Sequence, residues 1–127
     1  MEKTVIHTDN APKAIGPYSQ AIRVGDFIYT AGQTGFVPAT GEFAGATIEE
    51  QTHQVLKNIK AILEAAGSDM SKVVKTTVFL ANIQADFAKM NAIYAEYFGD
   101  KPPARSTVQV GALPRGAVVE IECVATV

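Results

Sequence analysis

Two segments in the C-terminal half of the chain carry apolar residues on both of their alternating faces. VVKTTVFL (73–80) and VVEIECVATV (118–127) are rich in β-branched residues, which favour strands. Successive side chains of a strand point to opposite faces, so both faces of the sheet that holds these segments need cover. The chain must supply that cover with helices, or a partner must supply the rest.

Two other segments predict helices, and they are the only candidates for this cover. In the first, Thr47 and Glu50 form a T-x-x-E capping box and Gly67 provides the stop, with apolar residues at helical spacing between them. The second spans about 85–98 and ends at Gly99. Its apolar side contains Phe87, Met90, Tyr94, Tyr97 and Phe98.

The rest of the chain predicts further strands. Apolar runs on either side of a Gly-Asp pair within 20–32 indicate a β-hairpin, and final strands are expected at about 105–110 and 118–126. The order predicts a single α+β domain over 1–127, with one sheet and two helices on one face. Because two helices leave the other face bare, we expect a homo-oligomer whose sheets meet, with clefts between the subunits.

Charge and cysteine content narrow the classes of function. The formal net charge is −2 and the pI is about 5.6, which argues against binding to nucleic acid. The single cysteine, Cys123, excludes an intrachain disulfide and fits a reducing compartment. The sequence has neither a signal-like apolar region nor an apolar run long enough to span a membrane. We therefore expect a cytoplasmic protein with no membrane contact.

The usual motifs for metals, nucleotides and thiol catalysis are missing. His7 and His53 are far apart in sequence and match no metal-ligand spacing. Cys123 has no histidine nearby in sequence and is predicted to pack in the core. GPYSQ and GQTG match neither nucleotide-binding fingerprint. We predict neither a metal nor a cofactor.

Three charged residues on the last two strands remain as candidates. Arg105 begins a strand, where it either anchors the strand through an ordinary ion pair or receives a ligand carboxylate in its planar fork. Glu120 and Glu122 share one face of the final strand. They are either solvated or paired with lysines, as strand carboxylates commonly are, or they form part of a site. The residue pattern alone leaves these alternatives open.

A family resemblance adds what periodicity cannot provide. The chain resembles the RidA (YjgF) family of reactive-intermediate deaminases from about His7 to its C-terminal end. The similar segments are AIGPYSQAI (14–22), TAGQTG (30–35), KAILEAAG (60–67), VVKTTVFL (73–80), PPARSTVQV (102–110) and ALPRGAVVEIE (112–122). The resemblance implies a chorismate-mutase-like fold, a homotrimer with active sites between subunits, and cofactor-independent hydrolysis of 2-imino acids. Substrates such as 2-iminobutanoate and 2-iminopropanoate would give 2-keto acids and ammonia.

The resemblance also implies roles for individual residues. Arg105 matches the arginine that holds the substrate carboxylate, and backbone groups around Ser106 and Thr107 line the same pocket. Glu120 matches the glutamate that holds and activates the attacking water. A protonated imine carbon is already electrophilic, so one arginine and one carboxylate suffice to orient substrate and water.

Other positions are implied with supporting roles. Tyr18 resembles a tyrosine that closes over the pocket, with a packing role in a Gly-Pro turn as the less favoured alternative. Gly32 and Asn91 match recurrent family positions, but Asn91 also suits a residue that caps or bridges backbone groups. Thr107 stands where many members carry cysteine, and Ala31 where serine is common. We expect these two departures to alter substrate preference rather than to abolish activity.

Two alternative functions belong to the same family. Some relatives are described as translation inhibitors with ribonuclease activity, which the net charge of −2 disfavours here. Others are linked to chaperone-like or regulatory protein binding, which would require an exposed apolar patch. The physiological imino acid and its pathway are not specified by the sequence.

Overall fold

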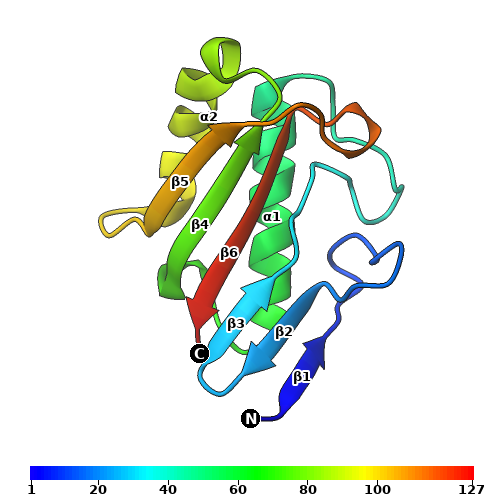
Figure 1. The fold of residues 1–127 in the computed structure, drawn as a ribbon, viewed down its shortest axis with the longest axis vertical. Helices are drawn as coiled ribbons and strands as arrows, with labels where there is room; N and C mark the ends of the chain where they lie inside the picture. The colour runs from blue at the N-terminus through cyan, green and yellow to red at the C-terminus, as the bar shows by residue number, and fades with distance from the viewer.

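The computed structural model describes residues 1–127 as a six-stranded mixed sheet with two helices on one face (Figure 1). The strands are β1 (Lys3–Ile6), β2 (Ala21–Val24), β3 (Phe27–Thr30), β4 (Val73–Leu80), β5 (Ala104–Gln109) and β6 (Val119–Thr126). Their order is β1-β2-β3-β6-β4-β5, and every pair is antiparallel except β4 and β5. Helices α1 (Ile48–Ala65) and α2 (Ile83–Phe98) lie behind the sheet. The predicted α+β fold is confirmed.

The structure corrects two details of the prediction. Strand β1 was not predicted, because its four residues are largely exposed and pair only with β2 at the edge of the sheet. Helix α2 begins at Ile83, two residues before the predicted start. The side chain of Asn82 caps it by accepting a hydrogen bond from the backbone N–H of Ala85 at 3.1 Å. Such a cap satisfies a donor that the first helical turn leaves free.

Helix α1 forms as its sequence pattern predicts. The Thr47 hydroxyl accepts from the Glu50 N–H at 3.1 Å, and the Glu50 carboxylate accepts from the Thr47 N–H at 3.3 Å. After the helix, Gly67 adopts the positive φ of 82° that ends the apolar stripe. The fully buried residues of this stripe are Val55, Leu56, Ile59, Ile62 and Leu63.

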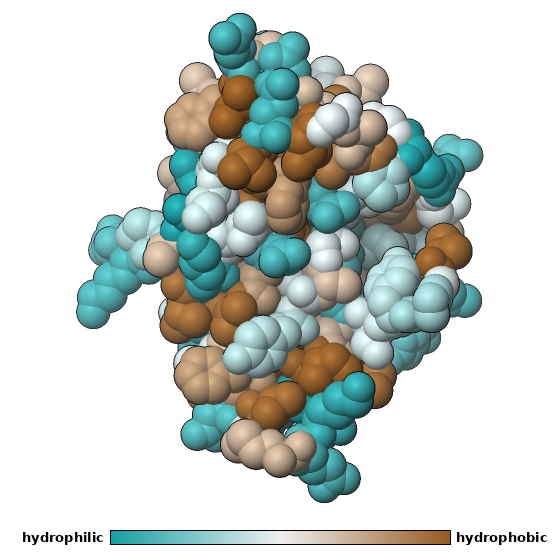
Figure 2. Space-filling view, viewed as in Figure 1, coloured by the Kyte–Doolittle hydropathy of each residue, from teal (hydrophilic) through white to brown (hydrophobic).

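The hydrophobic core fills the space between the helices and one face of the sheet. On β6, alternate residues from Val119 to Ala125 are buried in this core. The residues between them, including Glu120, therefore point to the opposite face, which we call the open face. No helix covers this face in Figure 1, and Figure 2 shows apolar side chains scattered among polar ones on it.

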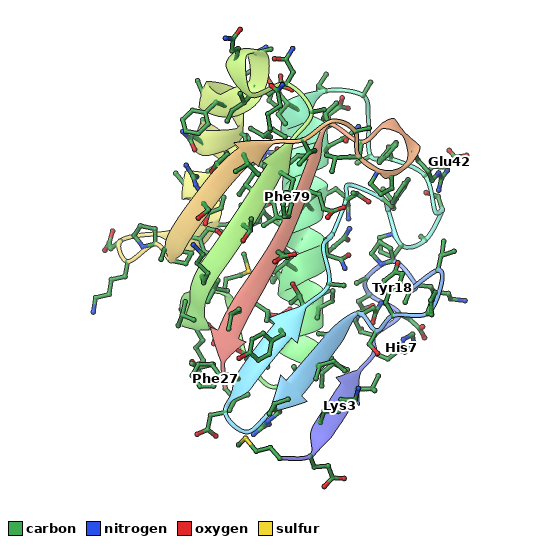
Figure 3. All side chains as sticks on the ribbon, viewed as in Figure 1. Lys3, His7, Tyr18, Phe27, Glu42 and Phe79 are labelled. Carbon is green, nitrogen blue, oxygen red and sulfur yellow. The ribbon has the colours of Figure 1, made fainter.

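Several large apolar side chains of the open face are exposed. Phe27 and Tyr29 are 44% and 48% exposed, and Val108 on β5 is 43% exposed. Phe79, labelled with Phe27 in Figure 3, is partly buried on the same face. These residues match the expectation that the helices leave one face of the sheet without cover. Neither helix is long and apolar enough to cross a membrane.

We predict that Thr47→Ala lowers the free energy of unfolding by about 1 kcal/mol, because the first turn of α1 loses its side-chain acceptor. Thr47→Ser keeps the hydroxyl and should stay near the wild-type value. Urea denaturation of all three proteins at one protein concentration measures the difference. Equal losses for both variants would show that the capping hydroxyl does not stabilise the helix.

Candidate functional site

A cavity of about 740 Å³ brings three of the predicted site residues together. Tyr18 enters it from the loop before β2, Gly32 from the segment after β3, and Glu120 from the start of β6. We call this space the Glu120 cavity. A concave site with few charged groups is typical of small-molecule binding.

Glu120 lies on the open face of the sheet at the wall of this cavity. It pairs in register with Phe79 on β4, and it is partly buried. Burial, together with the negative charge of Glu122, raises the pKa of the Glu120 carboxyl above its ordinary value. The fully solvated role that the sequence also allowed fits Glu122, which is exposed, but not Glu120. A carboxylate with a raised pKa is a stronger base than an ordinary one.

The backbone of Gly32 lies directly against the carboxylate of Glu120. A methyl group added at Gly32 would lie 2.7 Å from the carboxyl carbon of Glu120 and overlap its oxygen. The backbone is fixed there by its neighbour, since Gln33 and Ile121 exchange hydrogen bonds of 2.8 and 3.0 Å. A glycine before this bridge leaves room for the carboxylate beside the backbone.

Tyr18 is held at the mouth of the cavity and is 51% exposed. Its hydroxyl accepts a hydrogen bond from the Ile15 N–H at 3.1 Å, across the turn that contains Gly16 at φ 121°. The buried Gln20 anchors the preceding segment: its amide accepts from Thr8 N–H at 2.8 Å and donates to the Thr8 carbonyl at 3.0 Å. Figure 3 shows Tyr18 in this loop beside the sheet. Its exposed position fits a lining residue better than a packing aromatic.

Arg105 lies elsewhere, on the edge strand β5. It pairs with Thr76 and therefore faces α2 rather than the open face. Its guanidinium carbon lies 4.8 Å from the ring centre of Tyr94 and 5.7 Å from that of Phe87. The Arg105 side chain makes no ion pair within the chain, because the one ion-pair contact of the chain joins His7 and Asp9. The alternative that it anchors the strand through an ion pair is therefore wrong.

Two further predicted residues carry buried polar atoms near this edge. Thr107, two residues along β5, points to the same face as Arg105, and its hydroxyl is buried without a hydrogen-bond partner. Asn91 lies on α2 between Phe87 and Tyr94, and its side-chain oxygen is also buried and unpaired. Asn91 thus neither caps a helix nor bridges backbone groups within the chain. Buried polar atoms without partners are rare in native proteins and call for a reason.

Ser106 differs from its neighbours because it points to the open face. Its hydroxyl accepts a hydrogen bond from the Lys75 ammonium at 3.0 Å. β5 pairs with β4 alone, so the outer edge of the strand presents unpaired backbone groups to its surroundings. Backbone groups around Ser106 and Thr107 are thus available for contacts outside the sheet.

A single chain does not bring Arg105 and Glu120 together. The two side chains leave the sheet from opposite faces, and β4 separates their strands, so the strand backbones are about 10 Å apart. We call Arg105, Thr107 and Asn91 the β5 edge group. The predicted site residues therefore form two sets, one in the Glu120 cavity and one at the β5 edge.

The two histidines and the cysteine lie outside both sets. His53 contacts the Tyr97 hydroxyl at 3.0 Å between the two helices, and His7 contacts Asp9 on the surface. Cys123 is buried against Thr30, and burial raises the pKa of its thiol to about 11. The thiol is therefore protonated at neutral pH and suits the predicted packing role.

Sequence reasoning missed two cations in the Glu120 cavity, Lys13 and Arg115. Both come from loops whose path depends on the whole fold, so residue spacing gives no signal for their meeting. It also missed Asn58, which is buried on α1 and donates to the backbone oxygens of Phe36 and Thr34 at 2.9 and 3.3 Å. An asparagine inside the apolar stripe of a helix was the available signal, since buried amides need partners.

Comparison with known proteins identifies relatives whose sequences align with nearly the whole length of this chain. Reactive Intermediate Deaminase A, chloroplastic, from Arabidopsis thaliana is 52% identical over 99% of this chain and 67% of its own length. The human 2-iminobutanoate/2-iminopropanoate deaminase is 50% identical over 97% of this chain and 89% of its own. The crystal structure of E. coli TdcF with bound serine has a TM-score of 0.93 at 39% identity and covers 98% of each chain. The model of the family described as Endoribonuclease L-PSP matches residues 8–127, so this chain belongs to that family.

Proposed function

We propose that this protein hydrolyses reactive 2-imino acids, such as 2-iminobutanoate and 2-iminopropanoate, to 2-keto acids and ammonia. The main structural support for this proposal is Glu120, a partly buried carboxylate of raised pKa that lies in a cavity against the backbone of Gly32. The names of the Arabidopsis and human relatives, at 52% and 50% identity, support the same reaction. The reaction needs water, a base and a carboxylate-binding cation, and we propose that it uses no cofactor.

The proposed cation is Arg105 of a neighbouring copy of the chain. Its guanidinium rests on Tyr94 and Phe87 without a carboxylate partner, which leaves its fork free for a substrate carboxylate. Because Arg105 and Glu120 leave opposite faces of one sheet, we propose that they meet at a cleft between two copies. The exposed apolar residues of the open face support such an assembly, for which we propose a homotrimer.

The chemistry follows from these two groups. Arg105 holds the substrate carboxylate, and the Glu120 carboxylate takes a proton from water as the water oxygen bonds to C2 of the protonated imine. The product is a carbinolamine with a neutral amino group. Protonated Glu120 then returns its proton to that nitrogen. The C–N bond breaks, ammonia leaves, and loss of the hydroxyl proton gives the 2-keto acid.

Tyr18, Thr107 and Asn91 complete this proposal as lining residues. Tyr18 borders the cavity mouth and limits access of bulk water. The unpaired oxygens of Thr107 and Asn91 beside Arg105 are suited to contact a bound substrate or the neighbouring copy. We propose that Thr107, in place of the more common cysteine, tunes substrate preference. A cytoplasmic location stays a prediction from the cysteine content.

A ribonuclease function has less physical support, although the family description contains that word. Neither histidine of the chain lines the Glu120 cavity, and the net charge is −2. Binding to phosphate backbones normally requires a basic surface. Imine hydrolysis and RNA cleavage are distinguished by testing one purified preparation against both substrates.

We predict that Arg105→Ala lowers kcat/KM for 2-iminobutanoate by roughly thirty- to several-thousand-fold, because a charged bidentate contact is worth about 2 to 5 kcal/mol. Arg105→Lys keeps the charge but loses the planar fork, so its kcat/KM should lie between the values of the wild type and Arg105→Ala. The imine is generated by an amino acid oxidase and followed by semicarbazide trapping. Arg23→Ala, on β2, is the matched control and should retain activity. Near-normal turnover of Arg105→Ala would remove the carboxylate-binding role.

We predict that a site shared between copies allows two inactive variants to rescue each other. Arg105→Ala keeps Glu120, and Glu120→Gln keeps Arg105, so an interface with one of each in the right order has an intact site. Random mixing in equal amounts should restore about a quarter of wild-type activity in a cyclic oligomer. The measurement requires unfolding and refolding the two proteins together, with each refolded alone as the control. Mixtures no more active than their components would contradict a site formed by Arg105 of one copy and Glu120 of another.

We predict that Glu120→Gln abolishes most turnover yet raises stability at pH 7. Burial raises the pKa of Glu120 in the folded state, so ionisation there costs more than in the unfolded chain. The stability contributed by the protonated carboxyl is therefore present at acidic pH and lost as pH rises through the raised pKa. Urea denaturation should give Glu120→Gln a higher free energy of unfolding than the wild type at pH 7. This difference should vanish at a pH below the ordinary pKa of a carboxyl group. Loss of stability at both pH values would make Glu120 a structural residue.

A further inference from the structure

Arg115 has an unusual backbone in the turn between β5 and β6. Its φ is 56°, which makes it the one residue other than glycine with a positive φ in the chain. This conformation costs an L-residue about 1 kcal/mol, and such strain persists only where the surroundings enforce it. The turn is closed by hydrogen bonds from Gly116 N–H to Leu113 and from Ala117 N–H to Pro114, of 3.2 and 3.1 Å. The backbone thus fixes where the Arg115 side chain starts.

The guanidinium of Arg115 rests on an aromatic platform. Its central carbon lies 4.5 Å from the ring centre of Phe36, and its Nη1 donates to the Gly41 carbonyl at 3.4 Å. Phe36 is itself held in place, since its ring stacks on Phe43 at 4.1 Å and its carbonyl accepts from Asn58 at 2.9 Å. Figure 1 shows the turn before β6 (orange) next to the loop between β3 and α1. The charge is therefore positioned by two separate loops.

No carboxylate of the chain neutralises this cation. Arg115 makes no ion pair, and it uses one of its five N–H donors on Gly41. It lines the Glu120 cavity together with Lys13, so two cations face one carboxylate there, although the whole chain carries −2. A cavity wall with excess positive charge attracts anions.

The proposed reaction assigns no role to Arg115. The carboxylate on C1 of the substrate is assigned to Arg105 at the β5 edge, and the alkyl side chain of 2-iminobutanoate has no charge to offer. We propose that Arg115 binds a second carboxylate of the substrate, so that the protein also deaminates 2-imino dicarboxylic acids. This inference rests on the proposed function and adds a class of substrate to it.

The geometry of Arg115 suits a carboxylate ligand. A planar guanidinium pairs with a carboxylate through two parallel N–H···O bonds, and the ring of Phe36 covers one of its faces without occupying its edge. The reaction at C2 is the same, with water added and ammonia released, and the second carboxylate takes no part in bond changes. Arg115 is therefore a specificity-determining residue, not a catalytic one.

The test compares two substrates on the same protein. D-Aspartate oxidase converts D-aspartate to 2-iminosuccinate, and D-amino acid oxidase converts D-2-aminobutyrate to 2-iminobutanoate; semicarbazide trapping follows both. Arg115→Asn removes the charge with a residue that tolerates positive φ. We expect the ratio of kcat/KM for the dicarboxylic over the monocarboxylic imine to fall about tenfold. Arg115→Lys should preserve most of the ratio, and Lys57→Gln, an exposed charge on α1, controls for net charge.

Two outcomes would overturn the inference. One is a wild-type protein that hydrolyses 2-iminobutanoate but not 2-iminosuccinate, and the other is an equal loss on both substrates in Arg115→Asn. If the wild type hydrolyses neither imine, the proposed function fails. The second carboxylate site is then tested separately, by calorimetric binding of 2-oxoglutarate and 2-oxobutanoate. Selective loss of 2-oxoglutarate binding in Arg115→Asn supports a second carboxylate site, and unchanged binding overturns it.

Discussion

Two helices cover one face of a six-stranded sheet, and the side chains of the other face have no cover within the chain. On β6 this asymmetry separates Val119 and Ile121, which are fully buried, from Glu120, which borders a cavity. The alternation of a strand thus places a carboxylate one residue away from the core. The same alternation on β5 sends Arg105 to the helix side. In the assembly that we propose, copies associate through this bare face, and Arg105 of one copy completes the site beside Glu120 of its neighbour.

Buried amide side chains hold the backbone of the segments around the Glu120 cavity. Gln20 fixes the segment before Tyr18, Asn58 fixes the carbonyls of Thr34 and Phe36, and Gln51 accepts from the Val118 N–H at 3.0 Å. All of these amides are almost fully buried with hydrogen-bond partners. A wall held in this way keeps Gly32 against Glu120, where solvent is partly excluded. The raised pKa of Glu120 therefore has its origin in this burial, with a further contribution from the negative charge of Glu122.

The sequence predicted the elements whose signals are local. The capping box at Thr47 and the alternation in β4 and β6 need no long-range information, and the structure has them at those places. Strand β1 gave no signal because four exposed residues at a sheet edge carry little pattern. For the site, family motifs identified Glu120 and Gly32, but their contact depends on a bridge between Gln33 and Ile121. Arg115 was not predicted, because no sequence pattern reveals that its loop meets Phe36.

Aromatic rings hold two of the three arginines of the chain in the same way. Arg105 lies over Tyr94 and Phe87, and Arg115 lies over Phe36, whereas Arg23 donates to a backbone carbonyl on the surface. A salt bridge would position a guanidinium equally well but would occupy the fork that a ligand carboxylate needs. An aromatic face attracts the cation and leaves its N–H edge free. An aromatic partner therefore positions an arginine for binding a carboxylate ligand better than an acidic partner does.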